Sequence, residues 1–312
     1  MPRPRRIPVI VVGLVLAACD PPEAPVVVTA EPPAEPQVVL AGGLARAAAE
    51  PAPGLTSFSD AEAAYRNGRV DEARDFFAGY VAIKPDNPWG HYMLGLTLWR
   101  TGDLAAAEQS FRRSIELDGQ NPKAYFNAGR VLLGLDRSHE AFEQVELGLA
   151  LDSTSADGLR LLARAHAKLG NIDGALETYR RALVRDENDV WTLNNLGMLY
   201  LETGNPESAL GPLARAVTLR ATSPIFQNNF GAALERAGHS VSAKRAYEAA
   251  VRSDSTYRKA RHNLDRLTQF VTDSTPPDRI VTADLAEVFR LQVGMWKDSY
   301  PRPAVESVPP SR

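Results

Sequence analysis

The chain has 312 residues, of which 44% are hydrophobic and 23% are charged, so it can bury a sizeable core and has ordinary globular proportions. Alanine, leucine and arginine dominate its middle and β-branched runs are scarce there, which favours an all-α fold over a β-sheet. The formal net charge of −3 argues against a general nucleic-acid-binding surface.

The first nineteen residues have the layout of an export signal. Three arginines precede an apolar run over residues 7–18, which is too short for a comfortable permanent membrane span. The run ends at Cys19, the only cysteine of the chain, and the segment from Leu16 to Cys19 resembles the lipobox of bacterial lipoproteins. The resemblance implies a signal peptide over residues 1–19, lipidation of Cys19, and a lipid-anchored protein facing the periplasm. An uncleaved anchor and ordinary secretion are the alternatives.

Removal of residues 1–19 would take away three arginines and no acid, so the formal net charge would fall from −3 to −6. Asp20 follows the cysteine, and in enterobacterial lipoproteins an aspartate there favours the inner membrane. The choice between inner and outer membrane stays open. Residues 20–53 are rich in proline, alanine and valine with little periodicity, which predicts an extended tether with room for one short helix over 40–50.

Residues 54–257 repeat themselves every 34 residues without gaps. The six units are 54–87, 88–121, 122–155, 156–189, 190–223 and 224–257. Position 15 of a unit is glycine except at Asp136, which indicates a left-handed turn between two helices. Position 20 is always alanine and position 8 is alanine or glycine, so the paired helices can approach closely. The period and its columns resemble the tetratricopeptide repeat family, which implies an all-α, right-handed α-solenoid of six helical hairpins.

The chain after the last unit predicts two more helices. A helical pattern over residues 258–271 indicates a capping helix that completes a domain of residues 54–271. The proline-rich tail, residues 272–312, holds an amphipathic segment over 284–296. That segment would dock in the groove of the protein itself, pack on the capping helix, or order only with a partner.

The family resemblance implies a concave groove, lined by the first helix of each hairpin, that holds peptides. Aromatic and apolar side chains are frequent at these positions, namely Phe58, Tyr65, Trp89, Tyr92, Met93, Trp99, Phe126 and Trp191. Exposed rings often mark partner sites because they bury much area at a small entropic cost. The alternative is that these rings fill gaps between adjacent hairpins.

Polar residues on the same positions suggest two further features of the groove. Basic side chains opposed by Asp157 indicate an acidic segment or a C-terminal carboxylate as the ligand, or else an ordinary solvated face; they are Lys123, Arg130, Arg160, Arg164 and Lys168. Asparagines at position 6, with Asn194 and Asn228 beside two of them, partly resemble the ladder of the protein O-GlcNAc transferase superhelix. They are Asn127, Asn195 and Asn229, and local hydrogen bonding is the alternative role. The dicarboxylate clamp of chaperone adaptors is not predicted, since only Lys123 matches it.

The sequence predicts no catalytic site. The five histidines lie in different units without zinc-ligand spacing, and no phosphate-binding loop or nucleophile elbow is present. We therefore expect no metal, cofactor or small-molecule substrate, and a membrane-anchored scaffold that binds a protein or peptide. The combination of lipobox and six repeats also resembles pilotin lipoproteins, which makes a pilotin-like assembly factor for a secretin or type IV pilus the alternative. An enzyme is a remote third possibility.

Overall fold

The computed structural model describes residues 57–271 and 275–300, and every regular element in these two ranges is a helix. Each of the six 34-residue units forms one helical hairpin. The hairpins are α1 (Phe58–Arg66) with α2 (Val70–Ile83), α3 (Pro88–Thr101) with α4 (Leu104–Leu117), α5 (Pro122–Gly134) with α6 (Ser138–Leu151), α7 (Ala156–Lys168) with α8 (Ile172–Arg185), α9 (Val190–Glu202) with α10 (Pro206–Leu219), and α11 (Pro224–Arg236) with α12 (Ser240–Ser253). Two further helices follow, α13 (Arg258–Thr268) and α14 (Thr282–Ser299). The expected signal peptide, Cys19 and the tether lie outside the described residues.

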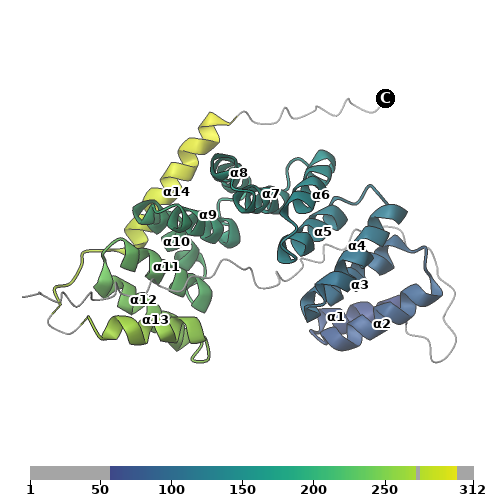
Figure 1. Ribbon diagram of the computed structural model, residues 1–312, viewed down its shortest axis with the longest axis horizontal. Coiled ribbons are helices and arrows are strands. Elements are labelled where there is room, and N and C mark those ends of the chain that lie inside the picture. The colour runs from purple at the N-terminus through teal and green to yellow at the C-terminus, as the bar shows by residue number, and fades with distance from the viewer. Residues whose placement is uncertain (1–56, 272–274, 301–312) are drawn as a thin grey trace, which may run out of the picture.

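The hairpins follow one another around an arch, with α1 and α2 at one foot, α7 and α8 at the top, and α13 at the other foot (Figure 1). From α3 to α13, each first helix contacts the first helix of the next unit. The second helices of neighbouring units make no comparable contact in the described part of the chain. This asymmetry bends the stack so that the first helices form its inner wall. The predicted all-α repeat solenoid is confirmed.

Local backbone geometry explains why each unit folds as a hairpin. All five glycines at position 15 have a positive φ, for example 87° at Gly102, and Asp136 adopts the same left-handed conformation with φ 56°. In units one to five the side chain at position 34 accepts a backbone hydrogen bond at the start of the next first helix, as Asn87 does from the Gly90 N–H at 2.7 Å, whereas Tyr257 in unit six makes no such cap. The repeat columns therefore encode a turn in each unit and a helix start after each of the first five.

Small side chains at position 8 set the distance between the paired helices. A β-carbon added to Gly197 would lie 2.4 Å from Leu213, and one added to Gly95 would lie 2.7 Å from the Phe111 ring. Larger side chains would force the hairpin open, because contacts this short do not occur between carbon atoms. The glycines at these two positions are thus needed for packing.

The tail helix α14 lies on the outside of the arch, against α10 and α8 (Figure 1). Docking of this segment in the groove or on the capping helix was expected from the sequence, and both expectations are wrong. Ala286, Phe289 and Val293 join the core formed by units four to six. Gly211 of α10 leaves the space for this packing, since a β-carbon there would lie 3.1 Å from the Phe289 side chain. The second helices of units four and five thus offer an apolar surface that the repeat pattern alone did not reveal.

Candidate functional site

The inner wall of the arch carries all the residues that the family resemblance assigns to a groove, but burial separates them into two groups. Several are buried and unavailable to a ligand, with exposed fractions of 8% or less: Tyr65, Tyr92, Met93, Phe126, Asn127, Arg160, Asn195 and Asn229. The others keep some exposed surface: Phe58, Trp89, Trp99, Lys123, Arg130, Arg164, Lys168 and Trp191. The wall is therefore less aromatic and less basic than the sequence suggests.

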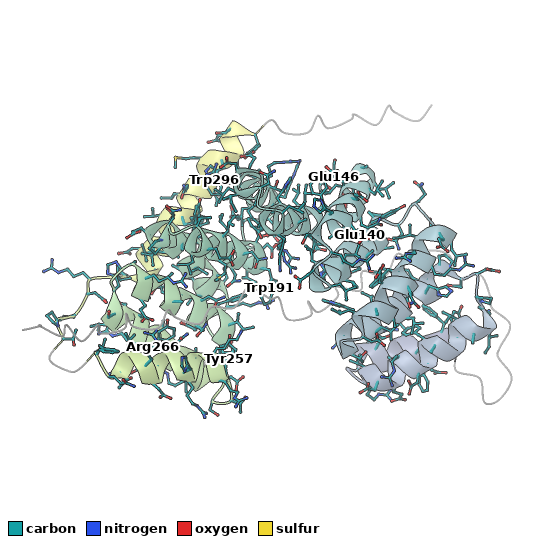
Figure 2. All side chains as sticks on the ribbon, in the orientation of Figure 1. Glu140, Glu146, Trp191, Tyr257, Arg266 and Trp296 are labelled. Atoms are coloured by element: carbon teal, nitrogen blue, oxygen red, sulfur yellow. The ribbon has the colours of Figure 1, made fainter. Side chains whose placement is uncertain are left out.

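Most of the aromatic rings pack within the solenoid, and some of them fill gaps between hairpins, as the alternative interpretation held. Trp191 of α9 meets the Phe226 ring of α11 edge-on at 4.9 Å, and Phe58 packs within its own hairpin, edge-on against the Phe77 ring at 5.5 Å. Figure 2 shows Trp191 on the inner side of the arch. Trp89 is the exception, because 37% of it is exposed while it stacks on Tyr92 with 4.9 Å between ring centroids. Trp89 is thus the aromatic of this set that a partner can reach most easily.

Phe126 shows why a groove position can be buried. Gly148 in α6 and Gly158 in α7 have no side chains, and a β-carbon added to either would lie 2.6 Å from the Phe126 ring. The ring occupies the space that both glycines leave at the joint between units three and four. A larger side chain at residue 148 would displace this ring.

Two of the predicted basic residues belong to a neutral ion network. Arg130 donates to both carboxylate oxygens of Asp157 at 2.7 and 2.8 Å, and its guanidinium lies 5.3 Å from the centroid of the Trp99 ring. Arg160 bonds to the same Asp157 and pairs with Asp189 at 3.1 Å. Two cations and two anions cancel, so these arginines link unit three to unit four as far as Asp189, the N-cap of α9, and add little net charge to the wall.

This network lowers the pKa of the Asp157 carboxyl. Burial acts to raise its pKa, but the charges and hydrogen bonds of Arg130 and Arg160 prevail and lower the pKa to about 2. A carboxylate with a lowered pKa stabilises the fold above its unfolded-state pKa, near 4, and loses that contribution as the pH falls through about 2.

Asp157→Asn should therefore lower the free energy of unfolding at pH 7 by about 1 kcal/mol, once solvent screening of the partly exposed carboxylate is allowed for. Urea denaturation at pH 7, 4 and 2 should show the difference from wild type shrinking as the pH falls. Asp265→Asn, at an exposed position on α13, should behave like wild type at each pH. A constant difference across this pH range would contradict the role given to the Asp157 charge.

Two of the remaining predicted basic residues, Arg164 and Lys168, lie at an open pocket of about 320 Å³ between α5, α7 and α9. Its lining includes the predicted Arg164, Lys168 and Asn195, and also the acids Asp136 and Glu202. Its other lining residues are mainly apolar, namely Leu133, Gly134, Ala167, Tyr179, Met198 and Leu199. The pocket is therefore lined by hydrophobic groups and by charges of both signs.

One ion pair lies in this pocket, between Lys168 and Asp136. Lys168 donates to Asp136 at 2.8 Å, and this ion pair lowers the pKa of Asp136. Burial raises the pKa of Glu202, against the opposing effect of Lys168 and Arg236. Sequence reasoning missed both acids, although Glu202 stands at position 13 of its unit, among the groove positions. Scoring acids together with bases at these positions would have found it.

The predicted asparagine ladder is an internal hydrogen-bond network. Asn263 donates to Asn228 at 2.9 Å, Asn228 to Asn229 at 3.2 Å, Asn229 to Asn194 at 2.9 Å, and Asn194 to Asn195 at 3.3 Å. We call these five residues the asparagine network. It connects α13, α11 and α9 within the core, and its last member lines the pocket.

A similar side-chain hydrogen bond between neighbouring first helices occurs in the first half of the solenoid. The Asn127 amide donates to the Tyr92 hydroxyl at 3.1 Å and to the Lys123 carbonyl at 2.9 Å. Burial raises the pKa of Tyr92 to about 12, so the hydroxyl stays neutral at physiological pH. Asn127 thus links α5 to α3 and is occupied within the protein.

Within the described ranges, no three histidine, cysteine or acidic side chains are grouped so that they could hold a metal ion. The described helices also include none that combines the length and the apolarity needed to span a membrane.

These features define a class of protein: an all-α repeat solenoid with a wall of first helices on its inner side. Models of the tetratricopeptide repeat match residues 40–88, 92–156 and 154–222. The chain belongs to the tetratricopeptide repeat family. Proteins of this family are generally adaptors that bind other proteins without catalysing reactions, and the fold supports a protein-interaction scaffold.

Known proteins resemble this chain through the repeats. A Schizosaccharomyces pombe protein described as a DnaJ homolog subfamily C member 7 homolog is 34% identical over 79 residues, which are 24% of this chain and 17% of that protein. The chain thus spans about a sixth of the curated relative that it matches.

Two solved structures share the fold at low sequence identity. TTC0263, a thermophilic TPR protein of Thermus thermophilus, has a TM-score of 0.53 and 20% identity, covering 58% of this chain and 98% of its own. A tetratricopeptide repeat protein from Parabacteroides merdae ATCC 43184 has a TM-score of 0.59 and 13% identity, covering 67% of this chain and 82% of its own. These likenesses show the fold alone.

Proposed function

We propose that this chain is a protein-interaction scaffold, anchored in the bacterial cell envelope by a lipid on Cys19, that holds a segment of a partner protein against its inner wall. The open pocket between α5, α7 and α9 is the observation that carries the proposal. Concave, partly apolar sites with a few polar groups are the usual places for ligands. A scaffold without catalytic activity is consistent with the family.

The chemistry of the inner wall narrows the kind of segment it would bind. The apolar part of the pocket suits the stem of a long side chain, and Arg164 and Glu202 at its edge suit a polar or charged end. Lys123 and Trp89, on neighbouring first helices, are exposed and could contact the same segment further along. A segment that combines apolar and acidic side chains fits this wall better than a purely acidic one, because Arg130 and Arg160 are neutralised by Asp157 and Asp189.

Photo-crosslinking in living cells tests the inner wall. A crosslinker at Trp89 or Lys168 should trap a partner, whereas one at Leu147, exposed on the outer helix α6, should not. The double variant Trp89→Ala with Arg164→Glu should weaken binding of the trapped partner at least tenfold, as expected for an aromatic anchor and a reversed charge. Unchanged affinity in the double variant would exclude this wall as the binding site.

The anchor has a separate test. Cys19→Ser should abolish acylation, because serine offers no thiol, and should leave residues 1–19 attached, so that the chain accumulates as a larger precursor. Metabolic labelling with a fatty-acid analogue measures the modification directly. A chain that is never labelled would refute the lipid anchor without affecting the scaffold proposal.

The pilotin-like role stays a separate candidate. Deletion of the gene should impair secretin assembly or pilus formation if that role is right. Normal secretins and pili in the deletion strain would dismiss it.

A further inference from the structure

The tail helix α14 has two apolar faces, of which the fold uses only one. Ala286, Phe289 and Val293 point into the core and are buried. Val288, Leu291 and Met295 lie on the opposite side and are 66%, 55% and 63% exposed. We call these three residues the outer stripe. Their spacing of three and four residues places them along one side of the helix over two turns.

The outer stripe is carried by a helix that is fixed to the body of the solenoid. The Arg180 guanidinium of α8 lies 5.6 Å from the centroid of the Trp296 ring, and Lys297 pairs with Glu187. The Tyr300 hydroxyl donates to Glu177 of α8 at 2.5 Å. Figure 2 shows Trp296 on the outer side of the arch, away from the inner wall. A helix attached along its length presents the stripe in a defined orientation and needs no further ordering to bind.

The approach to the α14 helix is held in a similar way. The Asp278 carboxylate accepts hydrogen bonds from the N–H and hydroxyl groups of Ser242, the former at 2.9 Å. This contact places the chain before α14 at the first turn of α12, where a carboxylate is favoured by the helix dipole. Both ends of α14 are thus tied to the repeats.

The border of the outer stripe is acidic. At about 100° per residue, Asp284 and Asp298 lie on the stripe's side of the helix, and both are exposed. Glu287 lies at the flank of the stripe, where Arg290 neutralises its charge. The two cations of the helix, Arg290 and Lys297, lie toward the far side and pair with Glu287 and Glu187. A partner approaching the stripe therefore meets hydrophobic side chains bordered by negative charge.

We propose that the outer stripe is a docking site for an amphipathic helix of a partner protein whose apolar side is bordered by lysine or arginine. Opposite charges at the border of a helix pair select the partner, while the apolar residues supply most of the buried area. The acidic border disfavours a second copy of this chain, since two identical stripes would bring like charges together. It also disfavours an anionic membrane surface. This site is independent of the inner wall, so the scaffold would bind two partners at once.

Two synthetic helical peptides with the same apolar stripe, one bordered by lysines and one by glutamates, test the proposal by fluorescence anisotropy with the full chain. The lysine peptide should bind at least tenfold more tightly than the glutamate peptide, and added salt should reduce the difference. Leu291→Ser with Met295→Ser should weaken its binding at least tenfold. Leu147→Ser, at an exposed leucine of α6, is the matched control and should leave binding unchanged.

Charge reversal gives a second variant at exposed positions. Asp284→Lys with Asp298→Lys should shift the preference toward the glutamate peptide. Equal binding of both peptides, or binding that survives the Leu291 and Met295 changes, would overturn the proposal. Sedimentation as a dimer that those changes dissociate would assign the stripe to a second copy instead, and loss of phosphatidylglycerol vesicle binding in the same variant would assign it to a membrane. Either result would also overturn it.

Discussion

Asn228→Ala should lower the free energy of unfolding by about 3 kcal/mol. Asn228 is completely buried, accepts a hydrogen bond from Asn263 and donates one to Asn229. Removal of its amide would deprive both neighbours of a partner inside the core, and each unsatisfied buried group costs about 1–3 kcal/mol. Urea denaturation followed by circular dichroism measures the loss, and hydrogen exchange should show faster opening of α11 and α13.

The exposed Gln109, within α4, provides the control, because Gln109→Ala should change stability by less than about 0.5 kcal/mol. The result also decides between the two roles of the asparagines. A peptide ladder predicts that Asn228→Ala weakens ligand binding and leaves stability intact. The hydrogen-bond network predicts the reverse, and an unaltered unfolding curve would refute it.

The fold could be predicted from the sequence because each repeat column has a local cause. A glycine at position 15 favours the left-handed turn, and a polar residue at position 34 starts the next helix, whatever the rest of the chain does. Asp136 adopts the same conformation with φ 56°, which shows that the turn tolerates an aspartate. Six repetitions of one local pattern leave little freedom for another topology.

The candidate site was less predictable, because contacts between units decide which of its side chains are buried and hydrogen-bonded within the protein. Position 5 of one unit and position 6 of the next are 35 residues apart, and in the structure they bond to each other in the pairs Tyr92–Asn127, Asn194–Asn229 and Asn228–Asn263. Periodicity identifies both positions as part of the inner wall, but it does not show that they satisfy each other. The separation of one period plus one residue is the signal that would have revealed it.

The net charge of the inner wall was also hard to predict, because it depends on which residues pair with its arginines. Asp189 is recognisable in the sequence as a helix N-cap, and it does accept a hydrogen bond from the Trp191 N–H at 3.1 Å. It also pairs with Arg160, which removes that arginine from the predicted basic surface. A count of arginines along the wall therefore overestimates its positive charge, since partners that come from other positions in the repeat neutralise them.

Phe289→Ala should lower the free energy of unfolding by about 3 kcal/mol and release α14 from the outside of the arch. The ring is 4% exposed and packs edge-on against Trp296 with 5.7 Å between centroids. It also lies over Gly211, where an added β-carbon would be 3.1 Å from the Phe289 side chain. Truncation of a buried phenylalanine typically costs about 3–5 kcal/mol through lost burial and the cavity left behind. Limited proteolysis should then cut within residues 282–299, which the wild-type chain should protect.

Val288→Ala is the matched control on the same helix, because Val288 is 66% exposed and its truncation should leave both stability and proteolysis unchanged.

Comparing Phe289→Ala with this control also shows whether α14 stabilises the repeats on which it packs. Each repeat of such an array contacts only its neighbours, so a helix that lies across α8 and α10 adds a contact that the repeats lack by themselves. If α14 joins units four and five in this way, hydrogen exchange in Phe289→Ala should increase at both α8 and α10. Faster exchange in α14 alone would mean that the helix is attached to the solenoid without bracing it.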